Sequence, residues 1–234
     1  MYNTTIILCT YNEVSNIEDT IKLIIKSVKN VKIIVIDDNS NDGTIKKLSE
    51  IKSIYNFDFI VRRNERGLAS ALREGFLKSV TNYMGFIDVN SKDQILQFPE
   101  MISKLKTGYD ISVLSRYIKG GGDKRVPLRV FTSWLINLLC KLFLRINFND
   151  FTSGIFIMKK EVFNNIIYKA EGHGEFFIEF IYKAYKKDYK IAEVPYIQKE
   201  DLNLSISKSN PNIIRFFYLG YKYFLRLLLT KFNF

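Results

Sequence analysis

Polar side chains that can bind a charged ligand follow three apolar runs in the first half of the sequence. The first run ends in Thr10-Tyr11-Asn12-Glu13, the second in Asp37-Asp38-Asn39-Ser40 and a later one in Asp88-Val89-Asn90. Carboxylates and amides accept hydrogen bonds and coordinate divalent cations. One aspartate at the end of a strand is often only a turn cap. Three such groups at one edge of a sheet would favour a ligand site.

The elements that position these groups alternate between strands and helices. Apolar runs predict strands at 4–9, 32–36, 57–62, 83–87 and 111–115, and helical periodicity predicts helices at 16–28, 45–54, 68–79 and 97–105. This alternation predicts an α/β fold with a mostly parallel sheet and helices on both faces. Ligands bind beyond the carboxyl ends of such strands, so the three polar groups should line one crevice.

The second half of the chain is much more basic than the first. Residues 111–234 carry 20 basic and 10 acidic side chains, a balance of +10, whereas residues 1–110 carry 15 and 14, a balance of +1. This asymmetry predicts an anionic partner, either nucleic acid or a membrane surface. Strands are expected at 152–158 and 190–195, with a helix at 175–186 between them.

Two segments of this half are predicted to be helices that lie on a membrane. Residues 212–232 place Arg215, Lys222 and Arg226 on one stripe and aromatic or aliphatic side chains on the other faces, and residues 126–148 have the same character. A helix of this kind is typical of a membrane interface. The alternative is a pair of core helices whose lysine side chains reach solvent. A nucleic-acid-binding helix would present more polar side chains, so we favour the membrane and expect no nucleic acid.

The order of the motifs along the chain resembles that of a known family. The motifs are Cys9-Thr10-Tyr11-Asn12-Glu13, Ile33–Thr44, Arg66–Ala71, Ser115-Arg116-Tyr117, Gly120-Gly121-Gly122, Asp150, Ser153-Gly154, Glu179, Glu193-Val194-Pro195 and Ser207-Lys208. Together they resemble a family 2 glycosyltransferase with the GT-A (Rossmann-like) fold, of the dolichol-phosphate mannose synthase type. We therefore predict one GT-A domain at 1–210, with a nucleotide-sugar half at 1–112 and an acceptor half at 113–210. An amphipathic interface helix would follow at 211–234.

The resemblance implies transfer of a hexose from a nucleotide-sugar donor to a polyprenyl or dolichyl monophosphate, with inversion. Mannose from GDP-mannose is the first candidate. The protein would bind peripherally to anionic lipid at the cytosolic face of a membrane, and neither a signal peptide nor a transmembrane helix is expected. The acceptor phosphate is already an anionic nucleophile, so catalysis would consist of aligning two anions and stabilising the leaving diphosphate. Nothing in the sequence indicates the oligomeric state.

The resemblance also implies roles for individual residues. The nucleotide-sugar site would comprise Thr10, Tyr11, Glu13, Ile36, Asp38, Asp88, Val89 and Asn90. The acceptor phosphate would contact Arg116, Arg129, Ser133 and Lys208. Arginine suits two-point phosphate binding, and lysine acts as a point charge. Asp88 and Arg116 would be the catalytic residues. Asp150 and Glu179 would support the acceptor pocket.

Two of the departures from the family's pattern concern groups that would bind the metal and the phosphates. The Asp-x-Asp motif, which normally holds the metal and diphosphate, is Asp88-Val89-Asn90, and Lys92 follows where an oxygen ligand is usual. Mg²⁺ and Mn²⁺ favour carboxylate oxygens, so we expect a divalent metal at Asp88 and Asn90 that is held weakly or is dispensable. Lys92 could replace part of the metal's charge, and Asp93 could supply a ligand. Leu202 stands where the family has a phosphate-binding arginine.

These departures leave two alternatives to mannose transfer. One is the same fold with another donor, such as UDP-glucose, or another acceptor. The other is a homologue that binds nucleotide or lipid phosphate without transfer. The lone His173 has no partner at a catalytic spacing, so we expect a structural role despite its useful titration range. Cys9 and Cys140 lie too far apart for a metal motif and are expected to be reduced thiols.

Overall fold

A seven-stranded sheet forms the centre of the molecule. The computed structural model describes residues 2–167, 169–200 and 213–232, the last range with side chains from Tyr218 onward. The strand order is β3-β2-β1-β4-β7-β5-β8, and a separate two-stranded sheet pairs β6 with β9. The strands are β1 Thr4–Thr10, β2 Val31–Asp37, β3 Asp58–Val61, β4 Tyr83–Asp88, β5 Ile111–Ser115, β6 Gly122–Asp123, β7 Phe156–Lys159, β8 Ile191–Pro195 and β9 Ile197–Gln198. All pairs in the large sheet are parallel except those of β7 with β4 and β5.

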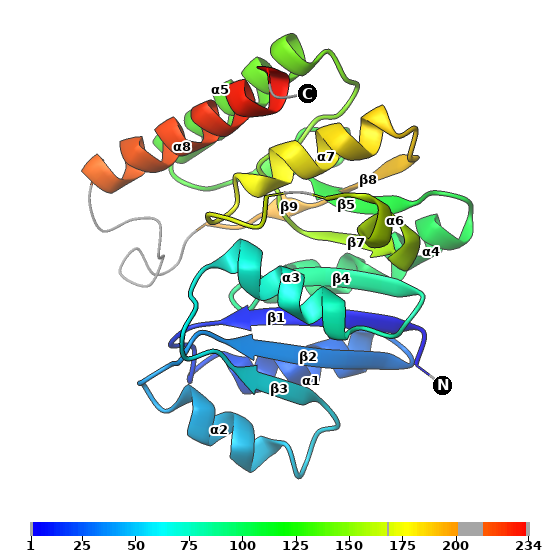
Figure 1. The fold of residues 1–234 in the computed structure, drawn as a ribbon, viewed down its shortest axis with the longest axis vertical. Helices are drawn as coiled ribbons and strands as arrows, with labels where there is room; N and C mark the ends of the chain where they lie inside the picture. Colours follow the sequence, from blue (N-terminus) through cyan, green and yellow to red (C-terminus); the bar gives the residue numbers. More distant parts are fainter. Residues whose placement is uncertain (1, 168, 201–212, 233–234) are drawn as a thin grey trace.

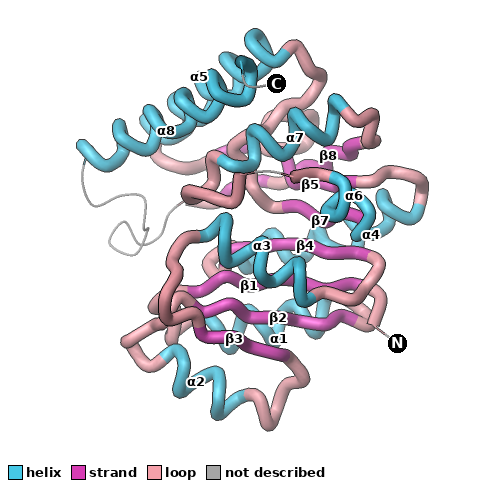
Figure 2. Tube along the Cα trace, viewed as in Figure 1, coloured by secondary structure: helices cyan, strands magenta, loops and turns pink. Residues whose placement is uncertain are grey.

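Helices cover both faces of this sheet, as Figures 1 and 2 show. They are α1 Ile17–Ser27, α2 Thr44–Ile51, α3 Leu68–Lys78, the 3₁₀ helix η1 Lys92–Gln97, α4 Phe98–Lys106, α5 Pro127–Leu144, α6 Lys160–Asn165, α7 Phe176–Lys186 and α8 Ile213–Phe232. Successive side chains of a strand point to opposite faces. Ile6 and Leu8 of β1 therefore pack with α1, α2 and α4, whereas Ile7 packs with α3 and α7. The alternation of one strand thus builds two cores.

The predicted α/β fold, with a mostly parallel sheet and helices on both faces, is confirmed. The segment predicted as a strand at 152–158 differs, because the strand begins only at Phe156 and runs antiparallel to its neighbours. The residues before it form a turn in which the backbone N–H of Ser153 donates to the carbonyl of Asp150 at 3.3 Å. Gly154 adopts a positive φ of 71° in this turn. The turn brings Thr152 and Ser153 to the cavity described below.

The two long helices of the second half, α5 and α8, lie against each other above α7 (Figure 1). Leu227 of α8 is buried in the core that α7 and the end of α5 share. Both helices nevertheless expose many large apolar side chains: Leu128, Phe131, Trp134, Leu135, Leu138, Leu142, Phe143, Tyr218, Tyr221, Phe224, Leu225, Leu229 and Phe232. We call this set the apolar face of α5 and α8.

One described helix, α5, is long and apolar enough to cross a membrane by length and composition alone. This is weak evidence for a span, because buried core helices pass the same test. Only 17% of α5 is buried, however, so the core does not account for its apolar character. The sequence had predicted no such helix. The predicted boundary near residue 210 lies outside the described residues, so the division at 1–210 and 211–234 stays a prediction.

Candidate active site

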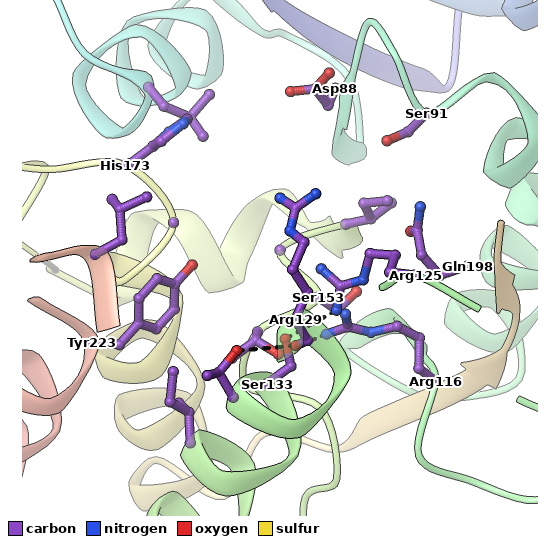
Figure 3. A pocket seen from close by; sticks show the side chains of 18 of the residues that line it. Asp88, Ser91, Arg116, Arg125, Arg129, Ser133, Ser153, His173, Gln198 and Tyr223 are labelled. Carbon is purple, nitrogen blue, oxygen red and sulfur yellow. Dashed lines mark hydrogen bonds between the residues drawn. The ribbon is translucent and has the colours of Figure 1, made fainter. Parts of the chain in front are cut away.

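A cavity of about 330 Å³ lies where β4 and β5 end, and α5, α8 and the loop before α7 close its other sides. Its polar lining includes Asp88, Ser91, Arg116, Arg125, Arg129, Thr132, Ser133, Thr152, Ser153, His173, Gln198 and Tyr223. In Figure 3, Asp88 lies at one end of the cavity and Ser133 at the other, with His173 and Tyr223 facing Arg116, Arg125 and Gln198. The cavity therefore joins the predicted donor end of the sheet to the predicted acceptor residues.

Arg116 is anchored by Asp150 on the floor of the cavity. Its Nε donates to Asp150 Oδ2 at 2.8 Å and its Nη2 to Asp150 Oδ1 at 2.7 Å. Further bonds go from Nη2 to Thr152 at 2.6 Å and from Nη1 to Asp123 at 3.2 Å. Burial opposes the charge on Arg116, but Asp150 outweighs it and raises the pKa of the guanidinium well above its usual value. Arg116 is a fixed cation that donates most of its hydrogens to the protein.

Arg125 is a charged residue of the cavity lining that the sequence analysis did not predict. Asp123 accepts from its Nε at 2.8 Å and from its Nη2 at 2.6 Å, and the same Nη2 donates to Ser133 Oγ at 3.0 Å. Burial would raise the pKa of Asp123, but Arg125 and then Arg116 lower it overall. The only sequence signal at Arg125 was a charge in a loop before a predicted helix, which describes many surface residues equally well.

The predicted acceptor residues Arg129 and Ser133 lie one turn apart on α5, and both line the cavity. The arginine–aspartate cluster beside them carries no net charge, since Arg116 and Arg125 balance Asp123 and Asp150. Lys208, the remaining predicted acceptor residue, lies outside the described residues, as does Leu202.

The predicted nucleoside residue Asp38 is held at the end of β2 by Arg62, a second residue that the sequence analysis missed. Arg62 Nε donates to Asp38 Oδ1 at 2.7 Å, and the backbone N–H of Gly67 donates to Asp38 Oδ2 at 2.8 Å. Arg62 also donates to Ser70 Oγ at 2.9 Å. Asp38 thus fixes the loop that leads into α3.

The other predicted nucleotide residues cluster near this edge, though not all with free side chains. The guanidinium of Arg66 lies 4.9 Å from the centre of the Tyr11 ring, an arrangement of the cation–π type. Thr10 and Glu13 are buried. Ile36 and Val89 have their side chains in the core. Ile36 and Val89 could therefore touch a nucleotide only through their backbone.

Asp88 and Asn90 behave differently as potential metal ligands. Asp88 lines the cavity, but the Asn90 amide donates to Glu13 Oε1 and accepts from Asn16 Nδ2, both at 3.0 Å. Lys92 pairs with Asp19 at 3.3 Å. In the part of the chain that is described, no three His, Cys, Asp or Glu side chains come together as a metal cage. Mg²⁺ often takes one or two carboxylates and completes its shell with phosphate oxygens and water. The residues fit a cation held jointly by Asp88 and a diphosphate.

Two more predicted residues, Asp93 and Glu179, are not part of the cavity lining and form ion pairs elsewhere. Asp93, considered as a spare ligand, pairs with Lys199 at 3.0 Å. Glu179 of α7 accepts from Lys183 at 2.7 Å and from Arg226 of α8 at 2.9 Å, so it fastens α8 to α7. His173 is exposed at the rim of the cavity.

Comparison with known proteins identifies the family. The model of the family described as "Glycosyl transferase family 2" matches residues 5–167, more than half of the chain. The chain belongs to glycosyl transferase family 2. The family predicted from the motifs is therefore confirmed.

Two curated relatives show where this family 2 chain is similar to characterised proteins. It is 32% identical to the dolichol-phosphate mannosyltransferase of Pyrococcus furiosus over 200 residues, which cover 82% of this chain and 55% of that protein. It is 26% identical to the polyprenol monophosphomannose synthase of Mycolicibacterium smegmatis over 221 residues, which cover 91% of this chain and 83% of that protein. The chain thus spans about half the length of the first relative and most of the second.

A solved structure confirms the GT-A-like fold. The glucosyl-3-phosphoglycerate synthase of Mycobacterium tuberculosis, in complex with Mn²⁺, UDP and glucosyl-3-phosphoglycerate, has a TM-score of 0.74 to this family 2 chain. The match covers 98% of this chain and 80% of that chain, at 18% identity. At this identity the similarity establishes the fold alone.

Proposed function

We propose that this chain transfers a hexose, with mannose from GDP-mannose as the first candidate, to a polyprenyl monophosphate. The observation that carries the proposal is that one cavity contains Asp88 at one end and Ser133 at the other, with the Arg129 side chain between them. Two phosphorylated reactants need separate cationic or metal sites within bonding distance of one sugar. The names of the two curated relatives support the same reaction class.

The mechanism follows from the positions of these groups. The acceptor phosphate would lie against Arg129 and Ser133, with Arg116 held beside it by Asp150. One of its oxygens forms the new bond to the anomeric carbon, and the bond from that carbon to the nucleoside diphosphate breaks with inversion. The phosphate is already an anion, so no proton has to be removed and no general base is required. The protein contributes alignment and fixed hydrogen-bond donors.

A divalent cation would be held by Asp88 together with the donor diphosphate. When bound, such a cation neutralises negative charge on the leaving diphosphate. Asp88 is the one carboxylate of this motif, because Asn90 carries an amide that already bonds Glu13 and Asn16. We therefore expect a weaker dependence on metal than two carboxylates would give.

We further propose that the protein binds peripherally to the cytosolic face of a membrane through the apolar face of α5 and α8. Large apolar side chains exposed along two adjacent helices are typical of a surface that contacts lipid. Arg129 and Ser133 lie on α5, so a lipid that enters beside this helix would bring its phosphate to the cavity. In this proposal α8 forms the amphipathic segment at 211–234 that follows a GT-A domain at 1–210.

Two alternatives remain specific enough to test. Structural neighbours crystallised with UDP-glucose and Mn²⁺ favour a different donor on the same fold. The engagement of Asn90 with Glu13 favours a homologue that binds nucleotide without transfer.

One assay separates these possibilities. Labelled GDP-mannose or UDP-glucose is incubated with polyprenyl phosphate and either Mn²⁺ or EDTA, and lipid-soluble label is counted. Mannosyl lipid that forms with Mn²⁺ supports the proposal. Glucosyl lipid alone supports the second donor, and absence of lipid label with both donors overturns transfer. Asn90→Asp should increase the stimulation by Mn²⁺ if Asp88 shares a cation with the donor.

A further inference from the structure

We propose that Arg125 binds the phosphate of the acceptor directly and orients Ser133 toward the same group. The inference rests on the proposed function, because it takes a phosphate monoester as the ligand of this end of the cavity. Arg125 lines the cavity and lies on the same side as Arg116 and Gln198 (Figure 3).

Arg125 has more N–H groups left for a ligand than Arg116 has. A guanidinium has five N–H donors. Arg116 gives four of them to Asp150, Asp123 and Thr152. Arg125 gives one from Nε and two from Nη2 to Asp123 and Ser133, and its Nη1 makes no bond to any described residue. Two hydrogens of Arg125 are therefore open to a phosphate, against one of Arg116.

Arg125 is already held in place before a ligand arrives. Its two-point pair with Asp123 fixes the plane of the guanidinium, and Arg116 Nη1 donates to the same Asp123 Oδ2 that Arg125 Nη2 bonds. The Arg125 side chain is only 14% exposed. A long side chain that is fixed in advance loses little rotamer entropy when it binds. Binding at such a site is favoured over binding at a mobile surface arginine.

The hydroxyl of Ser133 is positioned by Arg125. Its Oγ accepts from Arg125 Nη2 at 3.0 Å, and it donates to no acceptor among the residues described. A hydroxyl that accepts one hydrogen bond still has its own hydrogen to donate. Arg125 thus leaves Ser133 as a donor at the same end of the cavity, and the two side chains offer hydrogen-bond donors to one phosphate.

The test is a binding measurement on the full chain that does not need turnover. Trp134 is the single tryptophan, follows Ser133 on α5 and is half exposed, so its fluorescence should report occupancy of this end of the cavity. Farnesyl monophosphate, inorganic phosphate and farnesol are titrated against the wild type, Arg125→Met and Arg125→Lys. Arg73→Met is the matched control, because it also replaces an arginine by methionine but at an exposed position on α3.

We expect Arg125→Met to raise the Kd for farnesyl monophosphate at least tenfold, because charge-assisted hydrogen bonds are lost. The affinity for inorganic phosphate should fall in parallel if the phosphate alone is recognised, whereas the affinity for farnesol should change less than twofold. Arg125→Lys should recover part of the loss, since it keeps the charge without the two-point pair to Asp123. The double variant Arg125→Met/Ser133→Ala should lose less affinity for farnesyl monophosphate than the product of the fold-losses of the two single variants.

Two results would overturn the inference. One is unchanged affinity for farnesyl monophosphate in Arg125→Met. The other is a parallel fall in farnesol and GDP-mannose binding together with a lower Tm, which would assign Arg125 a structural role only. The outcome is separate from that of the proposed function. If the wild type transfers no hexose, and Arg125→Met binds phosphate more weakly than the wild type does, the inference stands and the proposed transfer is rejected. If the wild type transfers hexose, and Arg125→Met has an unchanged KM for the acceptor, the proposed function stands and the inference about Arg125 is rejected.

Discussion

Asp150 accepts three hydrogen bonds from Arg116, one from the backbone and two from the guanidinium, across 34 residues of sequence. The side chains of both residues are almost completely buried. This pair holds the floor of the cavity and links the end of β5 to the turn before β7. Asp150 was predicted as a supporting residue of the acceptor pocket, and the structure gives it a partner through which that support would act.

Replacing Asp150 by Asn should destabilise the protein strongly. The change removes the carboxylate that accepts two of the guanidinium hydrogen bonds and leaves buried Arg116 with Asp123, at 3.2 Å, as its charged partner. Breaking a buried ion pair in this way costs about 3–5 kcal/mol in comparable sites. Urea unfolding followed by circular dichroism measures the loss. Glu171→Gln, at an exposed pair with Lys169, should change the free energy of unfolding by less than about 1 kcal/mol. Equal small effects in both variants would contradict the anchoring role.

The lowered pKa of Asp123 predicts how stability depends on pH. The folded-state pKa of Asp123 lies below its ordinary value of 3.8, because Arg125 and Arg116 outweigh burial. The ionised carboxylate therefore stabilises the folded state above pH 3.8, and this contribution is lost as the pH falls through the folded-state pKa. Unfolding free energies measured from pH 6 to pH 3 should fall less steeply in Asp123→Asn than in the wild type. An identical slope in the two proteins would sink the prediction.

Single residues also show where sequence reasoning stops. The family resemblance assigned Asp88 to the nucleotide-sugar site and Arg129 and Ser133 to the acceptor phosphate, and the structure brings all three to one cavity. Arg125 and Arg62 were not predicted, because their partners are set by the fold and both look like solvated loop charges in the sequence. The Asn90 amide was predicted beside the metal, yet its bonds to Glu13 and Asn16 depend on how α1 packs against β4.

Among the helices and strands, the close packing of α3 on β1 is the clearest steric constraint. Gly75 of α3 lies over Ile7 of β1, and a Cβ at Gly75 would come within 2.5 Å of Ile7 Cγ2. The strands themselves were predictable, since continuous β-branched runs mark buried parallel strands. The late start and reversed direction of β7 were not, because they depend on the turn that Asp150 and Gly154 make.

Gly75→Ala should lower the free energy of unfolding by about 1–3 kcal/mol, since the added methyl group has no space. Gly220 of α8 offers a matched control, because it is also helical and a Cβ there meets no atom within 4 Å. Gly220→Ala should be neutral or slightly stabilising, as alanine favours helices over glycine. Denaturant titration of both variants checks the pair. A stable Gly75→Ala protein would contradict the close α3–β1 contact.

For the molecule as a whole, the near-neutral and the basic halves of the sequence each supply part of the lining of one cavity. The near-neutral first half supplies Asp88 and most of the parallel sheet. The basic second half supplies the arginines and the apolar face of α5 and α8. The exposure of this apolar face could not be predicted from the sequence, because the same residues would also suit two core helices. Tyr223 and Leu227 of α8 do pack inward, so deleting this helix would also open the core.

Point substitutions therefore test membrane binding more cleanly than a deletion. Phe131→Glu combined with Leu142→Glu changes two side chains of α5 that are 56% and 62% exposed. We expect vesicles that contain anionic lipid to bind this variant at least fivefold less than the wild type in a sedimentation assay. Val80→Glu, 76% exposed and beyond the end of α3, should bind as the wild type does. Equal binding by all three proteins would exclude this face from the membrane contact.

The most direct measurement is the transfer of labelled mannose from GDP-mannose to polyprenyl monophosphate, with polyprenol of the same chain length as the parallel acceptor. In the proposed function the arginine cluster and Ser133 bind the acceptor phosphate, so we predict lipid-soluble label with the monophosphate and none with the alcohol. Arg129→Met should reduce that label by at least tenfold, whereas Arg73→Met should leave it unchanged. Equal labelling of the two acceptors, or no labelling of either by any donor tested, would contradict a cavity that aligns a lipid phosphate with a sugar nucleotide.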